Sequence, residues 1–304
     1  MCCLFGLIDY GRRLSGRQRS RIIATLARQS EARGTDAAGI AYNSGGQLQI
    51  RKGPGPAHTL RLSVPNDAAV VLGHTRMTTQ GSAQKNRNNH PFAGKVPGGR
   101  FALAHNGVLW NDQLLRRSRN LPDTRIETDS YVAVQLIEQQ KALTPASLKT
   151  MAEAVEGSFV FTLLDEADNL YFVKGDNPLC LLHFPRLRLY LYASTREILQ
   201  NAVRRTWLAG EKRQEIPVLS GDILRIDRAG RRWTDHFEMH DDSNLFYGNW
   251  WGSRRRGQEP EWYWETLKGV AASCGYGPDD LEALRRQGYT TDEMEEMLYE
   301  CGLW

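Results

Sequence analysis

Cysteine is scarce in this 304-residue sequence, which has only five cysteines, at positions 2, 3, 180, 274 and 301. The number is odd, and no pair has the spacing of a zinc site. The adjacent residues Cys2 and Cys3 are also poorly placed for a disulfide bond with each other. We therefore expect reduced thiols, no metal and a cytoplasmic protein.

Long apolar runs and a strong charge of one sign are also missing. No apolar stretch approaches the roughly 20 residues that cross a bilayer. The segment CLFGLI is too short for a signal peptide, lacks a basic region before it and is followed by Asp9. The 39 basic and 35 acidic side chains leave a formal net charge of only +4. These absences argue against membrane insertion, secretion and nucleic-acid binding. A local basic patch could still bind nucleic acid.

What is present is an ordinary globular composition, with 41% hydrophobic and 24% charged residues. Apolar runs and helical periodicity predict strands and helices up to about residue 230. The predicted strands cover 4–10, 37–42, 47–52, 68–77 and 100–110, with further strands between 157 and 227. The predicted helices cover 17–31, 128–143 and 147–155, the second of them capped by Thr128. Two layers of strands flanked by helices indicate a layered α+β body.

The composition changes after about residue 232. Six of the eight tryptophans lie from position 233 onward, together with Gly, Asn and the basic triplet 254–256, and the end of the chain predicts a helix pair at about 279–300. This extension either packs on the main body or forms a patch for a protein partner, because Trp and Arg are enriched in binding hot spots. Nucleic-acid binding is disfavoured because the adjoining GQEPEWYWE is acidic.

The N-terminal sequence MCCLFGLIDY places a thiol directly after the initiator methionine. Removal of Met1 would give Cys2 a free α-amino group beside its thiol, so one residue would supply both a nucleophile and a base. The alternative is that Cys2 and Cys3 are small apolar residues that fill the start of a buried strand.

Three polar clusters stand at the ends of predicted strands, where a rigid scaffold can hold catalytic groups. They are RGTDAAGIA (33–41), GHTRMTTQG (73–81), which continues to NNHPF (88–92), and AHNG (104–107). Each alone has a simpler explanation: a turn with an ion pair, a solvated strand end and an Asn-Gly turn, respectively. Their order behind an N-terminal cysteine makes the set specific.

Together, these motifs resemble the class II glutamine amidotransferase domain of the N-terminal nucleophile hydrolases. That family begins with M-C-G-I-F-G-I, where this chain has MCCLFGL, and its RGxDSxGIA, GHxRxxTxG and HNG motifs correspond to the three clusters. TDS at 128–130, NPLCL at 177–181, YASTREIL at 192–199 and SGDILRID at 220–227 are similar to later features of the family.

The resemblance covers roughly residues 2–230 and implies a four-layer αββα sandwich. We predict a glutaminase domain at 2–231 and a small, Trp-rich, partly helical extension at 232–304.

The resemblance also implies the catalytic groups. Cys2 would be the nucleophile, and its own α-amine, a group with an unperturbed pKa near ~8, would carry the proton. The side-chain amide of Asn106 and the backbone N–H of Gly107 would form the oxyanion hole. No cofactor or metal is implied.

Glutamine carries an α-carboxylate and an α-ammonium group, and the resemblance implies a partner for each. Arg76 would bind the carboxylate, since a fork of two N–H donors fits two oxygens. Asp129 would bind the ammonium group, and the Thr79 hydroxyl would help to hold the substrate. Arg33 and His74 would support these groups from behind.

The chain departs from the family pattern at three positions. Cys3 replaces the usual glycine after the nucleophile, Ala37 replaces a serine, and Gln80 stands where some relatives carry an aromatic residue or histidine. None of these changes removes a catalytic group, so we expect hydrolysis of the glutamine side-chain amide to glutamate and ammonia.

Family members generally pass the ammonia to a second domain, but only about 70 residues follow position 232, and they contain no Gly-rich phosphate loop. We therefore expect either a separate acceptor protein or glutamate as the end product, from glutamine or from a γ-glutamyl compound. The alternative is a catalytically idle glutamine-binding or scaffold protein that acts through its C-terminal extension.

Overall fold

The computed structural model describes residues 2–239, together with 264, 268, 271, 276–287, 289 and 294. The chain divides into two compact units, Met1–His240 and Asp241–Trp304, which are considered separately.

Seven strands form the first sheet of the first unit, in the order β11-β9-β10-β1-β4-β2-β3. Every adjacent pair is antiparallel. All seven residues of β1 are buried, which explains its continuous apolar run. The bounds are β1 (Cys3–Asp9), β2 (Ala37–Ser44), β3 (Gln47–Pro54), β4 (Val70–Arg76), β9 (Cys180–Phe184), β10 (Leu189–Ala193) and β11 (Gln214–Ile216).

Six strands form the second sheet, in the order β13-β12-β8-β7-β6-β5, again antiparallel throughout. The long strand β6 carries the AHNG motif near its C-terminal end. The bounds are β5 (Phe92–Val96), β6 (Gly99–Leu109), β7 (Gly157–Asp165), β8 (Leu170–Lys174), β12 (Asp222–Ile226) and β13 (Arg232–His236).

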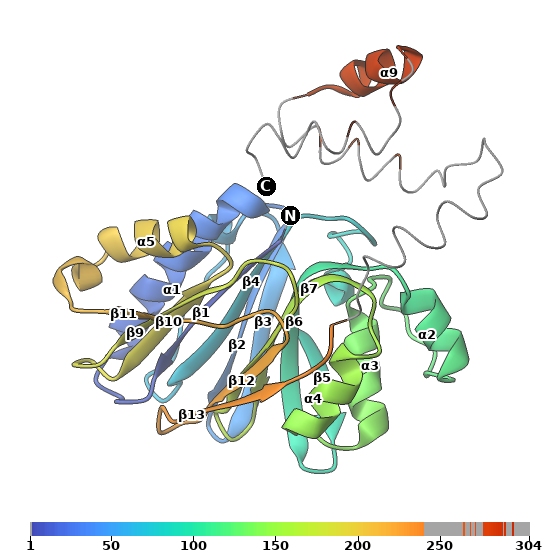
Figure 1. Ribbon diagram of the computed structural model, residues 1–304. Helices are drawn as coiled ribbons and strands as arrows, with labels where there is room; N and C mark the ends of the chain where they lie inside the picture. Colours follow the sequence, from blue (N-terminus) through green and yellow to red (C-terminus); the bar gives the residue numbers. More distant parts are fainter. Residues whose placement is uncertain are drawn as a thin grey trace. The chain divides into compact units, whose positions relative to one another are not determined.

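Helices cover the outer face of each sheet, which gives the predicted four-layer αββα arrangement (Figure 1). Helices α1 (Gly16–Ser30) and α5 (Arg196–Arg204) lie against the first sheet, and α2 (Asp112–Ser118), α3 (Tyr131–Gln140) and α4 (Pro145–Ala152) against the second. Short 3-10 helices, η1 (Glu31–Arg33), η2 (Ala57–Thr59), η3 (Asn86–Asn88) and η4 (Trp207–Gly210), occur in the connections.

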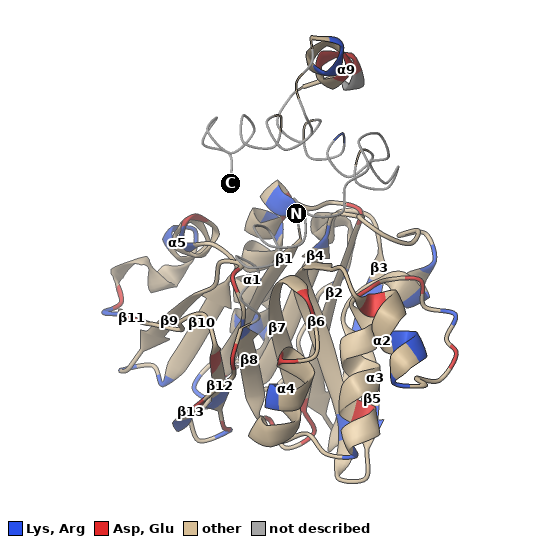
Figure 2. Ribbon diagram, turned by 45° about the vertical axis from the view of Figure 1, so that its right-hand side comes forward, with Lys and Arg blue, Asp and Glu red and all other residues tan. Residues whose placement is uncertain are grey.

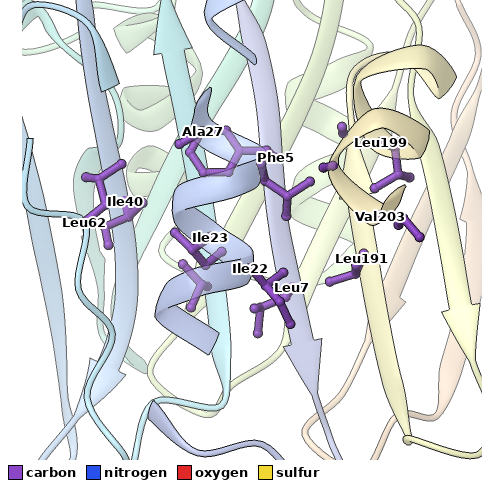
Figure 3. Packing of buried hydrophobic residues seen from close by; sticks show 14 of the residues in the cluster. Phe5, Leu7, Ile22, Ile23, Ala27, Ile40, Leu62, Leu191, Leu199 and Val203 are labelled. Carbon is purple, nitrogen blue, oxygen red and sulfur yellow. The ribbon is translucent and has the colours of Figure 1, made fainter. Parts of the chain in front are cut away.

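Three buried hydrophobic clusters match these layers. One lies between α1, α5 and the first sheet, where Phe5 and Leu7 of β1 meet Ile22 and Ile23 of α1 (Figure 3). A second lies between the second sheet and α3 and α4. The third fills the space between the two sheets, with Leu4 and Ile8 of β1 among its members. Alternate residues of β1 thus enter two different cores, as the period of a strand requires.

Two expectations from the sequence differ from the structure. Thr128 does not cap α3: the helix begins after Ser130, no side chain caps it, and the chain at 128–130 forms a turn. Strand β13 pairs with β12, so the second sheet and the first compact unit continue past residue 231.

In the second unit, α9 (Pro278–Arg286) corresponds to the first helix of the predicted pair. Trp264, Ala271, Leu281 and Met294 form a buried cluster of their own there. Most of the second predicted helix and four of the six tryptophans of the extension lie outside the described residues. No helix in the described parts of the chain is both long and apolar enough to span a membrane.

Candidate active site

Strand pairing brings the N-terminal cysteine beside the middle of the GHTRMTTQG motif, where β4 ends. Cys3 of β1 pairs with Thr75 of β4, so Cys2 lies beside the C-terminal end of β4. The Cys2 thiol donates a hydrogen bond to the Met77 carbonyl (3.4 Å), and Arg33 Nε donates to the Cys2 carbonyl (3.0 Å). Burial raises the pKa of the Cys2 thiol, and the positive charge of Arg76 opposes that shift.

The two adjacent cysteines have different environments. The Cys3 side chain is fully buried in the cluster between α1, α5 and the first sheet, and its thiol contacts the Leu4 carbonyl (3.3 Å). Cys2 is only partly buried and lines a cavity. The structure therefore separates one core cysteine from one cysteine that faces a candidate site.

Arg76, the last residue of β4, is held rigidly. Its side chain is buried, and its Nη1 donates to Asn89 Oδ1 (2.7 Å). Its Nη2 donates to the backbone carbonyls of Gln80 (2.5 Å) and Gly81 (2.9 Å). These bonds fix a guanidinium group at one wall of the cavity and hold the loop that follows β4 around it.

The AHNG motif lies on the facing sheet, where Asn106 pairs with Val160 and Gly107 with Phe159 of β7. Gly107 has a φ of 143°, and a Cβ at this position would collide with the Ser158 backbone carbonyl. The side chain of Asn106 is 1% exposed, and its Nδ2 has no hydrogen-bond partner among the described residues. Leaving a buried donor unpaired is costly in free energy. We therefore expect a bound ligand to supply the hydrogen-bond acceptor for this amide.

Asp129 follows the loop before α3 and is also buried. Its Oδ2 accepts a hydrogen bond from Leu109 N (2.7 Å), and its own N–H donates to Gln80 Oε1 (2.9 Å). Burial raises the pKa of the Asp129 carboxyl, whereas hydrogen bonds from Leu109 and Ser130 and the Arg76 charge oppose the rise. Asp129 therefore places a carboxyl group in the lining of the same cavity as the fixed Arg76 guanidinium.

Most of the predicted site residues line one small cavity. Its volume is about 10 Å³, room for a single water molecule. Asn106 is not among its lining residues, although its neighbour Gly107 is. The full lining is Cys2, Arg76, Met77, Thr79, Gln80, His90, His105, Gly107, Thr128, Asp129 and Ser130.

His74 lies behind the cavity and joins the two sheets. Its Nε2 is 2.9 Å from the His105 carbonyl, which can only accept, so Nε2 carries the proton. Burial lowers the pKa of His74 to about 3, so the ring is neutral at physiological pH. Arg33 likewise contacts the Cys2 backbone without lining the cavity.

Sequence reasoning did not single out two histidines that line the cavity, although both stood within its motifs. The His90 ring packs 4.2 Å from the His74 ring, and both of its nitrogens lack a partner among the described residues. The Nδ1 of His105 is 2.8 Å from Ser130 Oγ, and burial lowers the pKa of His105 to about 3. Within the described residues, no group of three or more His, Cys, Asp or Glu side chains is arranged to hold a metal.

Comparisons with known proteins show what part of the chain is similar to. Residues 74–201, which include Arg76, Asn106 and Asp129, match the family model described as a glutamine amidotransferase domain. This segment belongs to a glutamine amidotransferase domain.

Relatives of this amidotransferase domain are much longer than the chain. The glutamine–fructose-6-phosphate aminotransferase [isomerizing] of Listeria innocua is 36% identical over 158 residues, which cover 50% of this chain and 26% of that protein. The enzyme of the same name from Streptococcus pyogenes serotype M3 is 31% identical over 191 residues, covering 60% and 30%. The chain thus spans less than a third of these curated relatives.

Solved structures show the same fold. The glutamine phosphoribosylpyrophosphate amidotransferase from B. subtilis superposes with a TM-score of 0.63 at 22% identity, over 79% of this chain and 50% of that one. A structure described as the allosteric regulatory enzyme of purine biosynthesis gives a TM-score of 0.62 at 21% identity, with the same coverage of both chains.

Proposed function

We propose that this domain hydrolyses the side-chain amide of glutamine to glutamate and ammonia, with Cys2 as the nucleophile. The observation that carries the proposal is the cavity in which the Cys2 thiol meets Arg76, Gly107 and Asp129, beside the unpaired amide of Asn106. Nucleophilic attack on the side-chain amide of an amino acid requires a thiol, a cation and a carboxylate that bind the charged ends, and free N–H donors. This cavity and its surroundings provide all of these groups.

Removal of Met1 would complete the catalytic pair. The free α-amine of Cys2 would take the thiol proton as the sulfur attacks the carbonyl carbon of the side-chain amide, Cδ of glutamine, forming a tetrahedral intermediate. The same amine would then give that proton to the departing nitrogen, which leaves as ammonia, with a thioester left on Cys2. Water, deprotonated by the amine, would split the thioester to glutamate and restore the thiol.

The negative charge on the tetrahedral oxygen needs donors that are already in place. Asn106 Nδ2 and the Gly107 N–H are adjacent on β6 and would supply two. The left-handed backbone at Gly107 and its close approach to Ser158 hold the strand in the conformation that orients this pair.

The charged ends of glutamine would bind where the cavity carries the opposite charges. The Arg76 guanidinium would bind the α-carboxylate and Asp129 the α-ammonium group, with the Thr79 hydroxyl as a further contact. Arg33 and His74 act as positioning residues, through the Cys2 carbonyl and the His105 carbonyl respectively.

The cavity is too small for glutamine in this structure, so substrate entry requires its wall to move. Thr78, Thr79 and Gln80 are exposed and form the loop after β4. We infer that this loop opens, breaking the contact between Gln80 and the Asp129 N–H, and closes again over bound glutamine.

The ammonia would be passed to an acceptor domain or a partner protein. This part of the proposal is supported by the size of the relatives, which are named aminotransferases and are more than three times as long as the segment they share with this chain. Under this proposal the domain supplies only the glutaminase half of a transfer reaction.

The test is release of glutamate from L-glutamine by the purified protein, with the intact mass of the mature chain measured on the same sample. Cys2→Ala should abolish turnover, whereas Cys3→Ala, a change in the adjacent core cysteine, should retain it. No glutamate above the Cys2→Ala level from protein that lacks Met1 would reject glutamine hydrolysis.

The same assay separates the two alternatives. Faster release from γ-glutamyl amides or peptides than from glutamine at equal concentration would show a γ-glutamyl hydrolase. A rise in melting temperature with glutamine but no turnover would show an idle glutamine-binding protein.

A further inference from the structure

A second and much larger cavity lies at the opposite end of β1, within the first unit. Its volume is about 640 Å³, and it opens where β9, β10 and β11 of the first sheet face β12 and β13 of the second. Tyr10, which lines it, is eight residues from Cys2 along an extended strand, about 26 Å at roughly 3.3 Å per residue. Its lining includes Tyr10, His183, Tyr190, Ala229, Arg232 and Thr234.

One wall of this distal cavity is aromatic. The His183 and Tyr190 rings stack at 4.2 Å with an interplanar angle of 17°, and Tyr10 lies 5.4 Å from Tyr190. Flat side chains that are apolar on their faces and polar at their edges form surfaces on which planar rings pack.

The hydrogen bonds of this wall leave one donor unused. Gln214 Nε2 can only donate, so His183 Nδ1, 3.1 Å away, accepts, and His183 Nε2 carries the proton. That proton goes to the Tyr10 oxygen at 2.8 Å. The Tyr10 hydroxyl therefore keeps its own proton, for which no described residue provides an acceptor, at the edge of the cavity.

The other wall is positively charged. Asp227 pairs with Arg231 (2.9 Å), so its charge is already compensated, and no carboxylate of the described residues pairs with Arg232. Arg188 lies over the Tyr10 ring at 5.3 Å. Figure 2 shows further basic positions, with acidic ones among them, on the chain around β12 and β13. A cation would be repelled here, and a purely apolar ligand would desolvate Arg232 without pairing it.

We propose that the distal cavity binds a small phosphorylated compound with a planar aromatic ring, of the size and chemistry of a nucleoside monophosphate. The volume is within the ~300–1,000 Å³ range of small-molecule sites. The ring packs on the His183–Tyr190 wall, the phosphate takes two N–H donors from Arg232, and the Tyr10 hydroxyl and Thr234 bond the polar groups between them.

The proposal is tested by isothermal titration calorimetry on the full-length protein with AMP, GMP, CMP and UMP as probes, and with ribose 5-phosphate and inorganic phosphate as comparisons. At least one nucleotide should bind with a Kd of about 1 mM or lower. It should bind at least ~10-fold more tightly than either comparison, because only the nucleotide has a ring to stack.

Two variants and a matched control locate the site. Arg232→Gln should weaken nucleotide binding by about 10-fold or more, as loss of a charge-assisted pair does. Arg228→Gln removes an equal charge from an exposed residue of the same turn that is not in the lining, and should change the affinity less than about twofold. Ala229→Trp, at an exposed lining position, should fill the mouth and abolish binding.

Three outcomes would overturn the proposal: no nucleotide binding at about 10 mM, equal affinity for inorganic phosphate, or equal weakening by Arg232→Gln and Arg228→Gln. Because calorimetry reads binding directly, the result does not depend on whether glutamine is hydrolysed.

Discussion

Substitution of Asn106 can distinguish a catalytic role of its side chain from a structural one. Its Nδ2 is buried without a partner among the described residues, a situation that costs roughly 1–3 kcal/mol. Removing this donor gives up no hydrogen bond of the folded protein. We therefore expect Asn106→Ala to lower kcat for glutamine by about 10²–10³, with little change in melting temperature, when both are measured on one preparation.

Asn111 provides the matched control, because it is a buried asparagine with both ends of its amide paired. Its Nδ2 donates to the Ala154 carbonyl (3.0 Å), and its Oδ1 accepts from Glu156 N (3.0 Å). Asn111→Ala should lower the melting temperature and leave kcat per folded molecule nearly unchanged. The reverse pattern, in which Asn106→Ala loses stability but keeps kcat, would show that the Asn106 amide is structural.

The buried neutral histidines predict acid sensitivity. His74 has a pKa of about 3 when folded and an ordinary pKa near ~6.5 when unfolded. Below pH ~6.5 the unfolded chain binds a proton that the folded chain does not, so stability is complete above that pH and falls as the pH drops toward about 3. The slope is at most about 1.4 kcal/mol per pH unit for each such histidine.

This pH dependence is tested by urea unfolding of wild type and His74→Gln between pH 7 and pH 5. Glutamine keeps an N–H donor for the His105 carbonyl but does not titrate, so the variant should lose less stability over this interval. The same slope in both proteins would mean that His74 takes up its proton over the same pH range in the folded and the unfolded chain.

At the scale of the element, β6 depends on a glycine. A Cβ at Gly107 would collide with the Ser158 carbonyl of β7, and its φ of 143° is unfavourable for other residues. Gly107→Ala should therefore lower the free energy of unfolding by about 2–4 kcal/mol and abolish glutaminase activity.

Gly98→Ala is the control for that substitution, because a Cβ there, in the turn between β5 and β6, meets no atom within 4 Å. It should change the unfolding free energy by less than about 0.5 kcal/mol. Urea unfolding of both variants makes the comparison. A Gly107→Ala protein as stable as Gly98→Ala would contradict the described pairing of β6 with β7.

The strands and helices that could be predicted have a recognisable pattern in their own residues. The continuous apolar run of β1 and the helical spacing of Ile22, Ile23 and Leu26 in α1 need no knowledge of partners. Strand β13 has no such signal: all five of its residues are exposed, and it is a strand only because it pairs with β12. The prediction that Thr128 caps α3 was wrong, because Thr128 and Asp129 line the cavity in a turn and the helix begins only after Ser130.

For the candidate site, the motifs indicated residue types, and the sheets determined which of them meet. Cys2, Arg76 and Gly107 come from three segments that only the pairing of β1 with β4, and the stacking of the two sheets, brings together. His90 and His105 had no separate signal, because their burial and their unpaired nitrogens are products of that stacking.

At the scale of the whole molecule, the buried clusters predict where the chain can be divided. Among the described residues, the three clusters of the first unit contain none beyond Phe237, and the cluster of the second unit contains none before Trp264. A chain of residues 1–240 should therefore unfold at nearly the same temperature as the full-length protein and keep its glutaminase activity. Thermal unfolding and glutamate release measured on both chains test this.

A chain ending at residue 231, the boundary predicted from the sequence, is the informative control. It lacks β13 and also Phe237, which is 5% exposed and packs 5.9 Å from the Phe159 ring in the core beneath α3 and α4. Loss of a buried phenylalanine side chain alone costs about 3–5 kcal/mol, so 1–231 should be clearly less stable than 1–240. Equal stability of the two chains would place the boundary at 231 and make β13 and Phe237 part of the extension.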